Sequence, residues 1–176
     1  SFYPTKNLSC LGDGGAVVSD IDLTSITQLR NHGQSSRFNI EQVGWNSRLD
    51  SIQAELLNKE LQYLTYWNLR RNDIAEIYKN NLSDKVSWQP IVRNNVYHQF
   101  VILTKKKKEL QKHLKTHDVE SRSYYDPLPC DNEIYKTSNP IHNARRLSET
   151  NLAIPCNQYL TDAQINNIIK LINDFV

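Results

Sequence analysis

The residues best suited to chemistry are concentrated at the start of the chain, around one lysine. Lys6 stands in the run SFYPTKNL at residues 1–8, and the glycine-rich run GDGG follows at residues 12–15. A lysine amine acts as a nucleophile or a general base only after it loses its proton, which burial and neighbouring cations favour. The run at 12–15 lacks the spacing of a nucleotide-binding phosphate loop, so its predicted role is a hairpin turn. Whether Lys6 is catalytic or a surface charge depends on the residues around it.

Two later motifs carry polar side chains suited to binding. The motif LRNHG contains His32, which is either a site residue or a structural histidine with satisfied hydrogen bonds. The motif GWNSRLD contains Asn46, Ser47 and Arg48. As an alternative to binding, Asn46 or Ser47 would cap the helix that follows, and Arg48 would be a surface cation.

A third motif, SYYDPLP, places two tyrosines next to each other at Tyr124 and Tyr125. Each tyrosine offers a ligand a flat apolar face and a hydroxyl group. Both are therefore candidate substrate contacts, and packing within the domain is the alternative interpretation.

Taken together, the motifs resemble the DegT/DnrJ/EryC1/StrS family of sugar aminotransferases, which use pyridoxal 5'-phosphate (PLP). The lysine segment resembles the family pattern S-F-x-x-x-K-N-L, and residues 44–50 resemble its G-x-N-x-R-L/M segment. Three more runs match in the right order: YHQFVI at 97–102, LAIP at 152–155 and LTDAQI at 160–165. The resemblance implies an α/β protein of PLP-dependent transferase fold type I, here the end of the large domain plus a small C-terminal α+β domain.

The resemblance also implies a role for each candidate residue. Lys6 would hold PLP as a Schiff base and then move protons as a general acid and base. Ser1 would donate its hydroxyl to the cofactor phosphate. Asn46 would reach the cofactor phosphate of the neighbouring subunit, which implies an obligate homodimer with shared active sites. The expected substrate contacts are His32, Arg48, Tyr124 and Tyr125.

The implied reaction moves an amino group from glutamate to a keto-sugar carried on a nucleoside diphosphate. The run FYP at residues 2–4 is more similar to members that act at sugar C3 than at C4. It favours a dTDP-3-keto-6-deoxyhexose, for O-antigen, lipopolysaccharide or other glycan biosynthesis. Tyr124 and Cys130 stand where the family often has histidines, which leaves the sugar contacts open. The alternatives are a 4-keto-sugar aminotransferase and a non-catalytic PLP-fold fragment or regulator.

The hydrophobic pattern and the resemblance together divide the chain into three parts. Residues 1–47 would complete the large PLP-binding domain, residues 48–82 would form one long linking helix, and residues 83–176 would form the small α/β domain. Within the first part we expect a hairpin over 8–19 and a loop over 33–47.

The last part is expected to mix strands and helices. A box formed by Thr161 and Gln164 predicts the start of the final helix. The other expected elements are strands at 86–89, 97–104, 119–125 and 152–154, and helices at 105–117 and 142–150.

Composition narrows the classes of partner. The hydrophobic fraction is 39%, the charged fraction 23% and the net charge +2, so no general attraction to nucleic acid or membrane is expected. The run KKKK at 105–108 is interpreted as a solvated helix start. The three cysteines have no metal-ligand spacing and suit reduced thiols in the cytoplasm. No metal is expected.

The resemblance places the family lysine near the middle of a longer chain. There is no methionine among the 176 residues, which also indicates that residue 1 is not a translation start. We therefore expect the C-terminal half of an enzyme that is inactive by itself. The aromatic residue that stacks on the cofactor, and the aspartate that pairs with its pyridine nitrogen, are expected upstream of Ser1.

Overall fold

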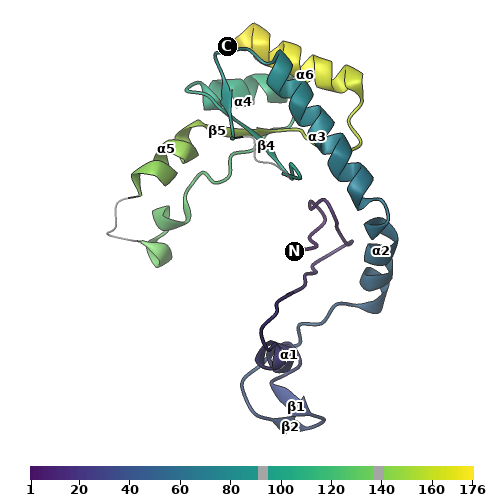
Figure 1. Ribbon diagram of the computed structural model, residues 1–176. Helices are drawn as coiled ribbons and strands as arrows, with labels where there is room; N and C mark the ends of the chain where they lie inside the picture. The colour runs from purple at the N-terminus through teal and green to yellow at the C-terminus, as the bar shows by residue number, and fades with distance from the viewer. Residues whose placement is uncertain (91–94, 137–140) are drawn as a thin grey trace. The chain divides into compact units, whose positions relative to one another are not determined.

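The computed structural model describes residues 1–90, 95–136 and 141–176 (Figure 1). The chain divides into two compact units, Ser1–Thr65 and Tyr66–Val176, hereafter the first and the second unit. Their boundary falls inside the predicted linking segment 48–82, and the roles assigned to the three sequence segments stay predictions. Among the described residues, no helix is long and apolar enough to cross a membrane.

The first unit contains short elements joined by long irregular segments. Helix α1 (Thr24–Leu29) is followed by a small antiparallel hairpin of β1 (Gln34–Ser36) and β2 (Asn39–Ile40), and later by helix α2 (Ser51–Leu61). Asp22 supports the start of α1, since its carboxylate accepts the N–H of Thr24 at 2.9 Å. The hairpin lies inside residues 33–47, where only a loop was expected.

The hairpin expected over residues 8–19 is wrong, because no strand forms there. The backbone donors of this segment find partners elsewhere. The N–H of Cys10 donates to the carbonyl of Phe2 at 2.8 Å, and the N–H of Leu11 donates to the Gln53 side chain at 2.9 Å. Both partners lie outside residues 8–19 in the sequence, so alternating residues within the segment predicted the wrong pairing.

The single long helix expected over 48–82 is instead two helices, α2 and α3 (Leu64–Asn81). The break contains neither proline nor glycine. It is a tight turn in which the N–H of Tyr63 donates to the Glu60 carbonyl at 2.9 Å, an i to i−3 bond. Helix α2 follows Asp50 at its N-cap position, and not Asn46 or Ser47. The capping alternative for Asn46 is therefore removed.

The second unit is built on a three-stranded antiparallel sheet in the order β3–β4–β5. The strands are β3 (Ser87–Trp88), β4 (Phe100–Leu103) and β5 (Asn151–Ile154), and Ile102 pairs with Leu152. The strand expected over 119–125 is wrong, since only an isolated bridge between Arg122 and Ala153 forms there. Residues 123–128 instead form a loop.

Helices α3, α4 (Lys107–Thr116) and α6 (Asp162–Phe175) pack with this sheet around one core, and Figure 1 shows α4 and α6 side by side. The remaining elements are α5 (His142–Thr150) and the short 3-10 helices Pro129–Asp131 and Glu133–Tyr135. The predicted start of α6 is confirmed, because Gln164 N–H donates to the Thr161 hydroxyl at 3.2 Å. Among the fully buried side chains are Tyr78, Phe100, Ile102, Leu110, Leu152, Ile165 and Ile172.

Candidate active-site residues

The segment that carries Lys6 is held by local hydrogen bonds. The N–H of Lys6 donates to the Tyr3 carbonyl at 2.9 Å, and the N–H of Phe2 donates to the Gly14 carbonyl at 2.7 Å. Cys10 is buried under this segment, with its thiol 3.1 Å from the Phe2 carbonyl. Lys6 itself is half-buried. The turn is therefore fixed on both sides of the lysine, and Cys10 has a structural role that the sequence alone did not indicate.

Ser1 lies at the other end of the same turn. Its hydroxyl oxygen accepts the N–H of Tyr3 at 3.3 Å, and the side chain is exposed. A hydroxyl that accepts one hydrogen bond keeps its own proton available for donation. Ser1 therefore keeps the hydroxyl proton that its predicted hydrogen bond to the cofactor phosphate requires.

Asn46 and Arg48 lie together in a pocket of about 860 Å³ in the first unit. Arg48 Nε donates to Asn46 Oδ1 at 2.8 Å, which directs the oxygen of the amide to the arginine and leaves the amide N–H₂ for another partner. The pocket is lined by Arg30, residues 13–17 and residues 46–49, together with Leu23, Ile26 and Thr27. Ser1 and Lys6 are not among these lining residues.

Arg30 is a candidate that the sequence analysis missed. It lies in the motif LRNHG, from which only His32 was selected, and it joins Arg48 in lining the same pocket. Two guanidinium groups and an amide make a donor-rich wall suited to an anion, because arginine presents several N–H groups in a fixed planar arrangement. Arg30 could be recognised as a candidate only once the structure showed that the motifs LRNHG and GWNSRLD lie side by side.

Backbone hydrogen bonds bring these two motifs together. The N–H of Trp45 donates to the Leu29 carbonyl at 2.8 Å, and the N–H of Ser47 donates to the Arg30 carbonyl at 2.9 Å. The two backbone segments lie so close together that glycine is needed at positions 33 and 44. A Cβ on Gly33 would lie 1.7 Å from the Gln42 carbonyl oxygen, and one on Gly44 would lie 2.2 Å from the Gly33 nitrogen.

His32 takes part in this junction through its backbone. Its N–H donates to the Trp45 carbonyl at 2.9 Å, and its φ of 61° is in the left-handed region. The side chain is exposed and is not among the residues that line the pocket around Arg48. A substrate contact by His32 stays a prediction.

Tyr124 and Tyr125 lie on a loop of the second unit. Their side chains are 38% and 65% exposed, with the ring centroids 5.3 Å apart in an edge-to-face arrangement. The peptide bonds Tyr124–Tyr125 and Asp126–Pro127 are cis. The tyrosines are thus more accessible than residues that only fill a core.

Asp126 lies in the same loop, residues 123–128, hereafter the tyrosine loop, and forms an ion pair with Lys107 at 2.6 Å. The hydrogen bond and the charge of Lys107 hold the pKa of the Asp126 carboxyl below its usual value. Lys107 is buried, which corrects the interpretation of residues 105–108 as a solvated helix start. The other three lysines of that run are exposed.

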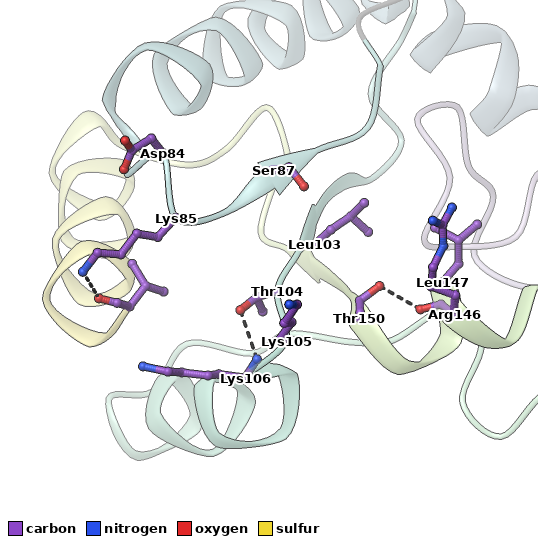
Figure 2. Close-up of a pocket in the computed structure, with 11 residues that line it drawn as sticks. Asp84, Lys85, Ser87, Leu103, Thr104, Lys105, Lys106, Arg146, Leu147 and Thr150 are labelled. Carbon is purple, nitrogen blue, oxygen red and sulfur yellow. Dashed lines mark hydrogen bonds between the residues drawn. The ribbon is translucent and has the colours of Figure 1, made fainter. Parts of the chain in front are cut away.

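A second pocket, of about 680 Å³, lies in the second unit (Figure 2). Lys85, Lys105, Lys106 and Arg146 contribute positive charge, and Lys85 Nζ donates to the carbonyl of Val176 at 2.7 Å. None of the candidate residues chosen from the sequence lines this pocket. Within the described parts of the chain, no group of three or more histidine, cysteine or acidic side chains could hold a metal ion.

The described residues thus combine a lysine on a fixed turn, a donor-rich pocket in the first unit and a loop with two tyrosines in the second unit. The chain belongs to the DegT/DnrJ/EryC1/StrS aminotransferase family, whose sequence profile matches residues 1–173. The expected fold class and the family's cofactor class are thereby confirmed. The roles of the individual residues stay predictions.

Individual relatives agree with this assignment. The chain is 32% identical over 186 residues to dTDP-3-amino-3,4,6-trideoxy-alpha-D-glucose transaminase of Streptomyces venezuelae, covering 99% of this chain and 49% of that protein. It is also 32% identical over 180 residues to a UDP-N-acetyl-3-dehydro-alpha-D-glucosamine 3-aminotransferase of Acidithiobacillus ferrooxidans, covering 98% of this chain and 48% of that one.

Solved structures show the same fold. The crystal structure of S. venezuelae DesV, in complex with a ketimine intermediate, superposes with a TM-score of 0.91 at 29% identity. The match covers 99% of this chain and 50% of DesV. The chain thus spans about half the length of the proteins that it matches.

Proposed function

We propose that this chain is the C-terminal half of a PLP-dependent aminotransferase that acts on a nucleotide-linked keto-sugar. The observation that carries the proposal is the lysine motif around Lys6, placed at the start of a family match that extends over residues 1–173. In the whole enzyme Lys6 holds the cofactor, and its freed amine then moves a proton from the α-carbon of the amino donor. The cofactor supplies an electron sink for the carbanion that this proton transfer creates.

The donor groups in the first unit fit a phosphorylated cofactor. Ser1 keeps a hydroxyl proton, and the Asn46 amide keeps its N–H₂ donors because its oxygen already accepts from Arg48. Neutral and cationic donors of this kind suit a phosphate dianion. We assign Ser1 to the phosphate in its own subunit and Asn46 to the phosphate in the neighbouring subunit.

The surface of the first unit supports a larger assembly. Many of its apolar side chains are exposed, including Val18 at 93%, Leu11 at 82% and Val43 at 82%. An apolar surface of this extent is costly in water and is typical of an interface. We propose that residues 1–47 complete the large domain of the enzyme, and that two such enzymes form a homodimer with shared sites.

The proposed acceptor is a 3-keto-sugar, with glutamate as the amino donor. Both relatives described above are named for amination at C3, one with dTDP and one with UDP, and they support C3 over C4 without deciding the nucleotide. We favour dTDP-3-keto-6-deoxyhexose from the FYP run at residues 2–4. The product would enter O-antigen or related glycan synthesis, and the enzyme would work in the cytoplasm. A 4-keto acceptor is the alternative within the same family.

The first test uses the full-length enzyme as isolated. We expect a yellow protein that, after borohydride reduction, carries the pyridoxyl group on Lys6 by peptide mass spectrometry. Lys6→Arg should abolish both the modification and amino transfer. The matched control Lys59→Arg changes an exposed lysine in a surface ion pair and should leave both unchanged.

Acceptor specificity is tested separately. The enzyme is assayed with dTDP- and UDP-linked 3-keto-sugars and with a 4-keto-sugar, using glutamate as donor. Preference for the 4-keto-sugar would replace the favoured substrate with the alternative. Bound PLP on Lys6 with no amino transfer to any of the three would support a non-catalytic relative and would contradict the proposed activity.

A further inference from the structure

Lys107 is a buried cation in a run of four lysines. Its side chain is 3% exposed, whereas Lys105, Lys106 and Lys108 are exposed. Figure 2 shows Lys105 and Lys106 at the wall of the open pocket of the second unit, where solvent reaches them. An ammonium group is taken out of water at considerable cost unless partners replace its hydration. The burial of Lys107 therefore needs an explanation that the neighbouring lysines do not.

Three oxygen acceptors surround the Lys107 ammonium. Its Nζ lies 2.6 Å from Asp126 Oδ2, 2.6 Å from the Ser148 carbonyl and 3.3 Å from the Ser123 hydroxyl. A lysine ammonium has three N–H donors, so this set satisfies it completely. Ser123 and Asp126 belong to the tyrosine loop, and Ser148 belongs to α5. The lysine at the start of α4 thus ties these two segments together.

Asn151 provides a second attachment for the same loop. Its Oδ1 accepts the Ser123 hydroxyl at 3.1 Å and the backbone N–H of Tyr124 at 2.9 Å, while its Nδ2 donates to the Leu147 carbonyl at 2.6 Å. Asn151 is itself buried, at 5% exposure. Lys107 and Asn151 therefore hold the residues on either side of Tyr125.

The loop is held through the side chains of Ser123 and Asp126 and the backbone N–H of Tyr124, whereas its two tyrosine rings stay accessible. The attachments reach Ser123, Tyr124 N–H and Asp126, yet the rings of Tyr124 and Tyr125 remain substantially exposed. If the loop only had to be stable, apolar side chains packed into the core would serve better than a buried ammonium. Fixing two exposed rings in one orientation lowers the entropy lost when a ligand contacts them.

We propose that Lys107 is a positioning residue that holds Tyr124 and Tyr125 for contact with the nucleotide-sugar. The proposal rests on the function proposed above, because it needs a sugar substrate at the tyrosine loop. Lys107 itself touches neither substrate nor cofactor. Its effect is expected in the half-reaction in which the sugar binds, since glutamate has no sugar or nucleotide for the tyrosine rings to contact.

The test compares Lys107→Met with Lys108→Met in the full-length enzyme. Methionine keeps an unbranched apolar stem and removes the charge and all three donors. We expect Lys107→Met to leave the rate of the glutamate half-reaction within about twofold of wild type. The same variant should lower kcat/KM for the sugar half-reaction about tenfold or more, mainly through KM. Lys108→Met should match wild type in both.

A second pair of measurements keeps the proposal testable if Lys107→Met folds poorly. Asp126→Asn removes the loop's charged partner at an exposed position, and hydrogen exchange of residues 123–126 should accelerate with a loss of sugar affinity. The effect of Asp126→Asn should shrink when Tyr124 and Tyr125 are both changed to alanine, because it acts through their rings.

The outcomes separate this proposal from the proposed function. Equal losses in both half-reactions would show a general structural role for Lys107, and no loss in either would show no role; both overturn the proposal. Full additivity with the tyrosine changes would also overturn it. A wild-type enzyme that binds PLP on Lys6 but aminates no sugar would instead refute the proposed function, independently of the Lys107 variants.

Discussion

Replacing Gly33 with alanine is expected to open the junction that places Asn46 and Arg30 beside each other. Gly33 has a φ of 75°, a conformation that costs an ordinary residue about 1–2 kcal/mol. The new Cβ would lie 1.7 Å from the Gln42 carbonyl oxygen, whereas Cβ atoms essentially never approach within 3.0 Å of another heavy atom. The backbone around Gln42 must therefore move by more than 1 Å.

This movement strains the hydrogen bonds of the junction. The carbonyl of Gly33 accepts the N–H groups of Glu41 at 2.9 Å and Gln42 at 3.4 Å, and the N–H of Gly33 donates to the Gln28 carbonyl at 2.8 Å. Losing one or two of these bonds costs about 0.5–1.5 kcal/mol each. Together with the backbone strain, the free energy of local opening should fall by about 2–4 kcal/mol. Exchange should then accelerate between about 30-fold and several hundred-fold.

The assay is hydrogen exchange on the full-length enzyme, read at peptides that contain Glu41 and Gln42. The matched control is Gly15→Ala, whose Cβ would lie 3.9 Å from the nearest heavy atom, the Cα of Ser1, which is an ordinary contact. Gly15→Ala should leave exchange in this region unchanged. If Gly33→Ala exchanges at the wild-type rate, the close approach of the two segments is not what holds the junction, and the reasoning fails.

Three further outcomes are expected. Burial raises the pKa of the Cys156 thiol to about 12, so iodoacetamide at pH 8 should label the half-exposed Cys130 and leave Cys156 unmodified in mass spectra of the folded protein. Arg71→Met leaves buried carbonyls unpaired and should cost about 2–4 kcal/mol in urea unfolding. The pKa of Asp126 is lower in the folded protein than in the unfolded chain, so its stabilising effect is complete above about pH 4 and declines as the pH falls through the folded-state pKa. Protection at 123–126, taken relative to the intrinsic exchange rate at each pH, should therefore fall below pH 4.

Local signals predicted some elements accurately. The capping box and the spacing of Ile165, Ile168 and Ile172 predicted α6, and the apolar run around Ile102 predicted β4. Each of these elements depends on partners within a few residues or on a long apolar pattern. Sequence periodicity records that information directly.

The errors have a shared cause, which is that the decisive partners are distant in sequence. Leu11 finds its hydrogen-bond partner at Gln53, so the hairpin around the glycines does not form. Lys107 is buried because Asp126 and Ser148 provide acceptors, and no local pattern distinguishes it from the lysine on either side. Arg30 was missed for the same reason, since its relation to Arg48 appears only after the two motifs pair in space.

The distribution of burial explains why the proposed chemistry needs more than this chain. An amine becomes an effective nucleophile when the surrounding structure excludes water and supplies a suitable electrostatic field. Lys6 is only half-buried, and the first unit around it leaves Val18, Leu11 and Val43 exposed. We expect the rest of the enzyme both to cover those apolar side chains and to exclude water from Lys6. Binding of the rest of the enzyme and activation of Lys6 are therefore expected to occur together, which is why the chain alone is proposed to be inactive.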